Sequence, residues 1–144
     1  MSVSKPSSVL VPVDFSAASF AAVQTALEFV DAPENVHVIF VVPARQSEAD
    51  FIREAMSNVG GLDRARAELA AKLKELGYPQ VQASIEEGAP ADVISQKAGE
   101  LDVELIIIPS HSRSGLPRLF LGSVAGQVLR SAPCPVLVLR RDEQ

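Results

Sequence analysis

The sequence lacks the features of disulfide-bonded and membrane-spanning proteins. Its 144 residues contain one cysteine, one tyrosine and no tryptophan. A single cysteine excludes an internal disulfide, which agrees with a reducing compartment. No apolar run approaches the ~20 residues of a transmembrane helix, and the first residues lack the apolar stretch of a signal peptide. We therefore expect a cytoplasmic protein with an aliphatic core, folded as one domain over residues 1–144.

Common catalytic and metal-binding motifs are also absent. There is no Gly-x4-Gly-Lys-Ser/Thr loop, which disfavours a P-loop NTPase, and no Cys-x2-Cys or His-Glu-x2-His spacing for zinc. No Gly-x-Ser-x-Gly nucleophile elbow is present. We interpret His37 and His111 as structural, and Cys134, which lies between two prolines, as a buried thiol. No acid–base pair is evident, so an enzyme is the least favoured class of function.

Positive charge is scarce overall but concentrated near the end of the chain. The net charge of −5 argues against a nucleic-acid partner. The segment Leu105–Arg141, however, contains five arginines and no acidic residue. Such a segment suits a small anionic ligand. The alternative is that the arginine stems cover apolar surface.

Short apolar runs rich in β-branched residues alternate with helical patterns. The runs that predict strands are Val9–Val13, Val36–Val42, Val81–Ile85, Val103–Ile108 and Pro135–Leu139. Apolar residues spaced by three and four predict helices over Phe20–Val30, Ala65–Leu76, Ile94–Leu101 and Ala125–Leu129. The alternation predicts an α/β protein with an open parallel sheet, right-handed crossovers and helices on both faces.

Candidate caps and breaks bound these helices. Ser16 is a candidate N-cap of the first helix, Gly77 a stop for the second and Pro90 a start for the third. The region Gln46–Gly61 carries helical spacing that Gly60-Gly61 should interrupt. We predict a loop there with a short helix, folded over a crevice.

Ligands of open parallel sheets bind beyond the carboxyl ends of the strands, where neighbouring crossovers leave in opposite directions. This rule selects Pro12 and Asp14, Val41 and Val42, and the segment Pro109–Ser123. That segment is small and polar, and it leads into a helix. Small residues let backbone amides approach an anion, and a helix N-terminus favours negative charge.

Two stretches resemble the universal stress protein family. One is VLVPVDFSAAS at the first strand, and the other is the C-terminal stretch that ends at Arg140 and contains GSVAGQVLR and APCPVLVLR. The resemblance covers Ser8–Arg140. It implies a Rossmann-like five-stranded parallel sheet of order 3-2-1-4-5, usually paired into a homodimer. It also implies a stress-associated regulatory protein that binds an adenine nucleotide, ATP or AMP, with Mg²⁺ on the phosphates.

The resemblance assigns roles to particular residues. Nucleotide-binding members carry Gly-x2-Gly-x9-Gly-Ser/Thr, and the corresponding positions here are Pro109, Ser112 and Gly122-Ser123. Two of the three glycines are therefore replaced. Because proline has no N–H to donate and a serine side chain can crowd a phosphate, these departures predict a weaker hold on the nucleotide.

The other candidate contacts each have a structural alternative. Asp14 is expected to contact the nucleotide near the ribose or adenine, or else to cap the following helix. Pro12 and Val41 match positions that line an adenine pocket, and they also suit the core. Ser123 and the loop amides, including that of Ser110, are candidate phosphate contacts, although Ser123 can instead cap its helix. Arg113 can reach phosphates or face water.

Three functions follow from these observations. The first is a nucleotide-binding regulatory protein. The second is a nucleotide-free dimeric stress protein that acts through its surface, and the third is a slow ATPase or self-phosphorylating protein. We expect dimerisation through Val136–Leu139, because this last apolar strand should lie at an unprotected sheet edge.

Overall fold

The computed structural model describes residues 5–43, 61–110 and 123–140 of the chain. Its first half contains β1 (Val9–Val13), α1 (Ala17–Phe29), the 3-10 turn η1 (Pro33–Asn35), β2 (Val36–Pro43) and α3 (Gly61–Glu75). Its second half contains β3 (Gln82–Gly88), α4 (Pro90–Leu101), β4 (Leu105–Pro109), α5 (Ser123–Ser131) and β5 (Val136–Leu139). The loop predicted over Gln46–Gly61 lies, apart from Gly61, outside the described residues.

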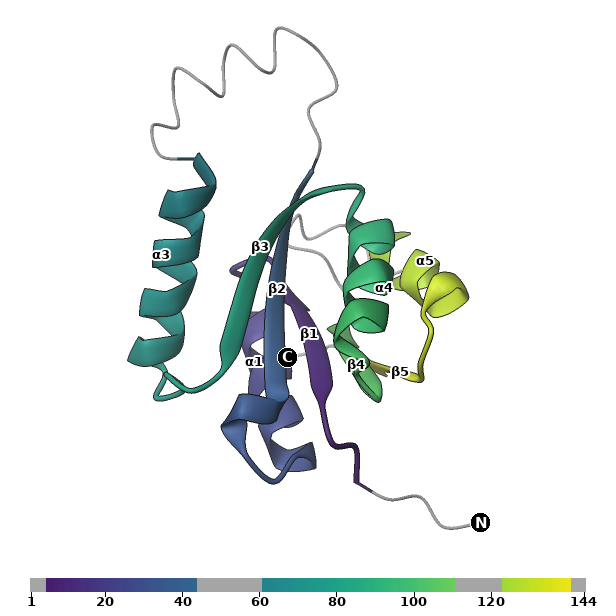
Figure 1. Cartoon of the computed structure of the whole chain (residues 1–144), viewed down its shortest axis with the longest axis horizontal. Coiled ribbons are helices and arrows are strands. Elements are labelled where there is room, and N and C mark those ends of the chain that lie inside the picture. Colours follow the sequence, from purple (N-terminus) through teal and green to yellow (C-terminus); the bar gives the residue numbers. More distant parts are fainter. Residues whose placement is uncertain (1–4, 44–60, 111–122, 141–144) are drawn as a thin grey trace, which may run out of the picture.

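The five strands form one parallel sheet in the order β3-β2-β1-β4-β5, which confirms the predicted Rossmann-like topology (Figure 1). β1 lies at the centre of the sheet. The chain adds β2 and β3 on one side of β1 and then β4 and β5 on the other, so the crossovers leave β1 in opposite directions. β1 and β2 pair along five residues, from Val9↔Val36 to Val13↔Phe40. β1 and β4 pair only at Val9↔Leu105 and Leu10↔Ile106. The register between β1 and β4 therefore ends well before either strand does.

Helices cover both faces of the sheet, and each face has its own hydrophobic core. Because strand side chains alternate, Val9 and Val11 join one core with residues of α1 and α3, such as Leu69. Leu10 faces the other core and packs with residues of α4 and α5, including Ile94. The two helix layers thus bury the central strand from both sides. Along the part of the chain that the structure describes, no helix is long and apolar enough to cross a bilayer.

Most predicted helix boundaries are confirmed. Ser16 caps α1, since its Oγ accepts a hydrogen bond from the Ser19 backbone N–H at 3.1 Å. Gly77, with φ of +91°, follows the end of α3. The predicted apolar stripes are wrong at their ends, because Leu76, Leu101 and Leu129 are exposed. Each of these leucines lies in the last turn of its helix or just beyond it.

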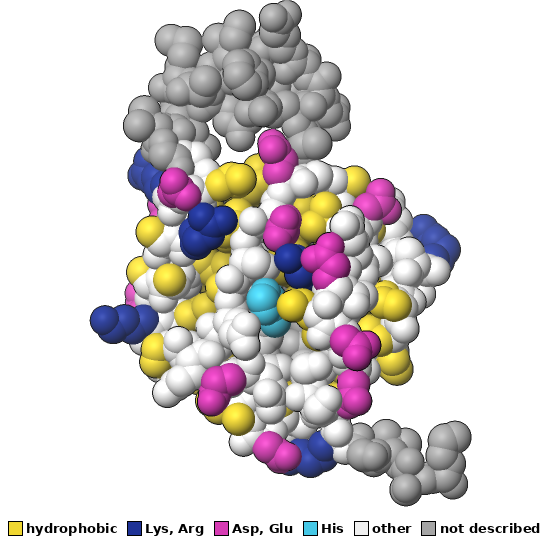
Figure 2. All heavy atoms as spheres, in the orientation of Figure 1, with side chains coloured by type: hydrophobic (Ala, Val, Ile, Leu, Met, Phe, Trp, Pro, Cys, Tyr) yellow, Lys and Arg dark blue, Asp and Glu magenta, His cyan; other side chains and the backbone are white. Residues whose placement is uncertain are grey.

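The third strand differs most from its prediction. β3 begins at Gln82 and continues through Glu86 and Glu87 to Gly88, although glutamate has little intrinsic preference for strands. Pairing with β2, which extends to Pro43↔Gly88, holds these residues in the sheet. Ala83, which the alternation predicts to be covered, is exposed. Figure 2 shows acidic side chains spread over the face formed by β3 and α4.

Candidate functional site

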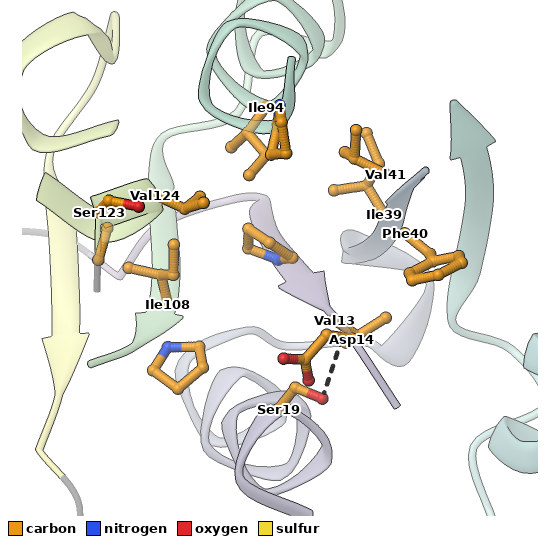
Figure 3. A pocket seen from close by; sticks show the side chains of 14 residues that line it. Val13, Asp14, Ser19, Ile39, Phe40, Val41, Ile94, Ile108, Ser123 and Val124 are labelled. Atoms are coloured by element: carbon orange, nitrogen blue, oxygen red, sulfur yellow. Dashed lines mark hydrogen bonds between the residues drawn. The ribbon is translucent and has the colours of Figure 1, made fainter. Parts of the chain in front are cut away.

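A pocket of about 200 Å³ opens at the carboxyl ends of β1, β2 and β4 (Figure 3). It lies where β1 and β4 separate after their last pair, Leu10↔Ile106. Pro12, which has no N–H to give to a ladder, lies in this separated part of β1. The residues that line the pocket are Pro12, Val13, Asp14, Ser19, Ile39, Phe40, Val41, Pro90, Ile94, Ile108, Pro109, Ser123, Val124 and Ala125.

The walls of the pocket are mostly apolar and come from four different elements. Ile39 and Val41 project from β2, Ile94 from α4, Ile108 from β4 and Val124 from α5 (Figure 3). Aliphatic side chains that approach from opposite sides suit a flat, uncharged ring. An apolar cavity with a few convergent polar groups is the usual form of a small-molecule site.

The polar groups of the pocket lie on two rims. Asp14 follows the end of β1, and Ser123 is the first residue of α5 (Figure 3). Asp14 is half-buried, whereas Ser123 is exposed. The first turn of a helix presents N–H groups that its own backbone does not use, and the helix dipole there favours an anion. One rim therefore offers a hydrogen-bond acceptor and the other an environment suited to negative charge.

Hydrogen bonds fix the turn that carries Asp14. The Asp14 Oδ1 accepts from the Ser16 backbone N–H at 3.0 Å, and the Asp14 N–H donates to Ser19 Oγ at 3.3 Å. Ser19 Oγ in turn donates to the Ser16 carbonyl at 2.9 Å. Ser16, and not Asp14, supplies the N-cap of α1. The Asp14 carboxylate therefore stabilises the preceding turn and also lines the pocket.

Five of the nine predicted site residues meet in this pocket: Pro12, Asp14, Val41, Pro109 and Ser123. Ser110 is not among the lining residues. It is buried, and its N–H donates to the Leu139 carbonyl at 2.9 Å, which extends the β4–β5 pairing. The remaining three predictions, Ser112, Arg113 and Gly122, fall outside the described residues.

The sequence interpretation missed the contribution of α4. Pro90 and Ile94 both line the pocket, and they lie four residues apart at the start of that helix. It also missed Ile39 and Phe40 of β2. Ile39 was detectable in principle, since it lies two residues before Val41 and so projects from the same face of the strand.

Apart from Asp14, the titratable groups of the described residues lie outside the pocket lining. His37 Nε2 is 2.9 Å from Ser84 Oγ. Burial lowers the pKa of His37, the Lys97 ammonium lowers it further, and Glu86 opposes them. His37 is therefore neutral at pH 7. Cys134 is half-buried rather than fully buried as predicted, and this partial burial raises the pKa of its thiol, which agrees with an unreactive cysteine. Among the described residues, no cluster of histidine, cysteine and carboxylate groups could hold a metal ion.

Comparisons with known proteins agree on one family. The model of the universal stress protein family matches residues 7–140. Universal stress protein MJ0531 of Methanocaldococcus jannaschii is 29% identical over 143 residues, which cover 94% of this chain and 83% of that protein. The solved structure of the hypothetical protein MJ0577 is 26% identical, with a TM-score of 0.79 and coverage of 96% of this chain and 98% of that one.

A third comparison concerns a protein whose ligand is known. The structure of a universal stress protein family member from Arabidopsis thaliana was solved with AMP bound. It is 23% identical to this chain, has a TM-score of 0.58 and covers 95% of this chain and 93% of its own. At 23% identity, this similarity shows that the two proteins share a fold.

Proposed function

Because the chain belongs to the universal stress protein family, we propose that it is a regulatory stress protein that holds an adenine nucleotide in the pocket between β1 and β4. The observation that carries this proposal is the combination of an apolar slot with Asp14 on one rim and the start of α5 on the other. The AMP complex of the Arabidopsis relative supports the same choice of ligand.

Each part of a nucleotide has a matching part of the pocket. The adenine ring fits between Ile39 and Val41 of β2 and Ile94 of α4, where it loses contact with water. The ribose hydroxyls can donate to the Asp14 carboxylate, and the phosphates can point toward the first turn of α5. Mg²⁺ would accompany a di- or triphosphate, bound chiefly by the phosphate oxygens and water.

Pro109 bears on which nucleotide is preferred. It ends β4 at the edge of the pocket, and it cannot donate an N–H to a phosphate. Loss of one donor weakens the hold on a polyphosphate more than the hold on the base and ribose. We therefore propose that AMP is bound about as well as ATP, in contrast to a site built for the triphosphate.

The partner we propose is a second copy of this chain. β5 is an edge strand, and all four of its residues remain half-exposed in the single chain. Antiparallel pairing of two such edges would satisfy the open hydrogen-bonding side of both. It would also bring Arg140, which follows the strand, beside the beginning of the other copy's β5.

A groove at the beginning of β5 suits that arrangement. It has a volume of about 620 Å³ and is lined by Lys5, Pro6, Glu28, Phe29, Glu104, Leu105, Pro135, Val136 and Leu137. Its two glutamates, Glu28 and Glu104, can form ion pairs with an arginine from the second copy. We propose that the protein is a homodimer in the cytoplasm. Its single cysteine cannot form an internal disulfide, which agrees with a reducing compartment.

The test begins with the protein as purified. Acid extraction should release an adenine nucleotide, and calorimetric titration of the emptied protein with AMP and ATP, with and without Mg²⁺, should give binding in the micromolar range. The double variant Pro109→Gly with Ser112→Gly should bind ATP more tightly, because a backbone donor returns and a side chain is removed. If neither protein binds either nucleotide at millimolar concentration, the nucleotide proposal is wrong, and a nucleotide-free dimer that acts through its surface takes its place.

A further inference from the structure

Phe15 has a backbone conformation that its side chain does not favour. Its φ is +66°, directly after Asp14 in the turn between β1 and α1. Over the described residues, Asp102 is the other non-glycine with positive φ, and it forms the C-cap of α4, where the left-handed conformation is common. Phe15 occupies no such cap. A bulky aromatic residue with positive φ persists only where its surroundings hold it there.

An aromatic cluster provides that restraint. The Phe15 ring meets the Phe40 ring edge to face, with centroids 5.0 Å apart and planes at 82°. It also meets the Phe20 ring, with centroids 6.0 Å apart and planes at 70°. Both geometries are favourable for aromatic pairs. Phe20 belongs to α1, and Phe40 belongs to β2 and lines the pocket.

The bend at Phe15 controls the orientation of Asp14. The Asp14 carboxylate reaches across Phe15 to accept from the Ser16 N–H at 3.0 Å. That hydrogen bond spans one intervening residue, so the backbone dihedral angles of Phe15 set its length. If the chain relaxed to negative φ at this residue, the carboxylate and the amide would separate and the carboxylate would turn away from its present direction.

We propose that Phe15 is a positioning residue, whose ring clamps the left-handed turn that directs the Asp14 carboxylate into the pocket. The identity of the ligand rests on the nucleotide proposal, but the positioning itself does not. The clamp exists in the free protein and can be measured there.

The test compares two variants that lose the same ring. Phe15→Gly removes the clamp but accepts positive φ without strain, whereas Phe15→Ala removes the clamp and resists positive φ. In the nucleotide-free protein, NMR should show amide exchange at Ser16 about tenfold faster for Phe15→Ala than for Phe15→Gly, which stays near the wild-type rate. Tyr78→Ala is the control, since Tyr78 is an aromatic residue that packs against the same core from beyond the end of α3. It should leave exchange at Ser16 unchanged.

Binding provides the second measurement. AMP should bind about tenfold more weakly to Phe15→Ala than to Phe15→Gly, although both variants have lost the same contacts of the ring. Equal exchange rates and equal affinities in the two variants would overturn the proposal, because the ring would then act only through packing. If the wild-type protein binds no nucleotide, the proposed function fails, and the exchange at Ser16 alone decides whether Phe15 holds the turn.

Discussion

At the scale of single residues, the two most informative side chains are Asp14 and His37. Asp14 is half-buried at the end of the central strand, where one of its oxygens holds the β1–α1 turn. His37 is half-buried near Lys97 of α4, and its ring forms a hydrogen bond with Ser84 of the neighbouring strand. Asp14 lines the pocket, whereas His37 bonds to a neighbouring strand. Substitution of Asp14 should therefore change ligand binding, and substitution of His37 should change stability.

Asn at position 14 keeps the shape of the side chain and an oxygen for Ser16, but it removes the charge. A hydrogen bond to a charged group contributes about 1.5–3 kcal/mol, so Asp14→Asn should weaken AMP binding at least about tenfold. Urea unfolding should change little. The control is Asp31→Asn, which removes an equal charge from an exposed ion pair with Lys5. An unchanged affinity in Asp14→Asn would remove Asp14 from the ligand contacts.

The stability of the fold should depend on pH through His37. Because the folded pKa of His37 lies below its ordinary value of 6.5, the unfolded chain takes up a proton more readily than the folded one. The contribution of neutral His37 is therefore complete above that value and is lost as the pH falls below it. The groups that face His37 are Ser84 and Glu86 from β3 and Lys97 from α4.

Urea unfolding of the wild type and of His37→Gln between about pH 8 and about pH 5 measures this effect. The free energy of unfolding should fall more steeply with acid in the wild type than in the variant. Parallel pH profiles for the two proteins would show that His37 does not contribute. Glu100, which pairs with Lys97 at 3.6 Å, is unchanged in both proteins and cancels in the comparison.

At the scale of elements, the connection from β3 to α4 is short, because Ala89 alone separates the end of the strand from the start of the helix. Gly88 has φ of +150°, and a Cβ added there would lie 2.8 Å from Val93 Cγ2. The close approach lets α4 begin immediately after the strand, with Pro90 and Ile94 over the pocket. A glycine is required here for two reasons, the backbone angle and the space.

Gly88→Ala should therefore destabilise the protein by about 1–3 kcal/mol, the usual cost of a strained backbone. Gly99→Ala is the matched comparison within α4, because a Cβ there meets nothing within 4 Å and alanine favours a helix interior by about 0.5–1 kcal/mol. Thermal unfolding should show opposite shifts for the two variants. Shifts of the same sign would mean that the β3–α4 connection tolerates a side chain.

The elements also show how far local patterns reach. The run Val9–Val13 is apolar throughout and was predictable as a strand. The topological rule then located Pro12 and Asp14 beside the crevice. The strand character of Glu86 and Glu87 was not predictable, because it comes from pairing with β2. The place of Ile94 in the pocket lining was not predictable either. Packing between segments that are distant in the sequence decides which helix covers the crevice.

At the scale of the whole molecule, the open edge of β5 predicts self-association. In the proposed dimer, Arg140 of each copy lies near Glu104 at the rim of the other copy's groove. Arg140→Glu and Glu104→Lys should each weaken the dimer about tenfold, because each sets like charges side by side. Sedimentation equilibrium gives the dissociation constants.

The double variant provides the decisive comparison, because it exchanges the two charges and should restore the wild-type dissociation constant. Lys74→Glu, which changes the charge on the exposed side of α3, is the control and should leave association unaffected. A double variant weaker than either single variant would exclude antiparallel pairing of β5 with this contact.

The short register between β1 and β4 has a consequence for the lifetime of the protein. Two residue pairs at the beginning of β1 and β4 join these strands, and beyond them the strands separate. A molecule that occupies the gap between β1 and β4 contacts both sides of the sheet. An occupant that binds only the folded chain adds about 2.7 kcal/mol of stability at one hundred times its dissociation constant. Proteolysis through the unfolded chain should therefore be slower when the gap is occupied than when it is empty.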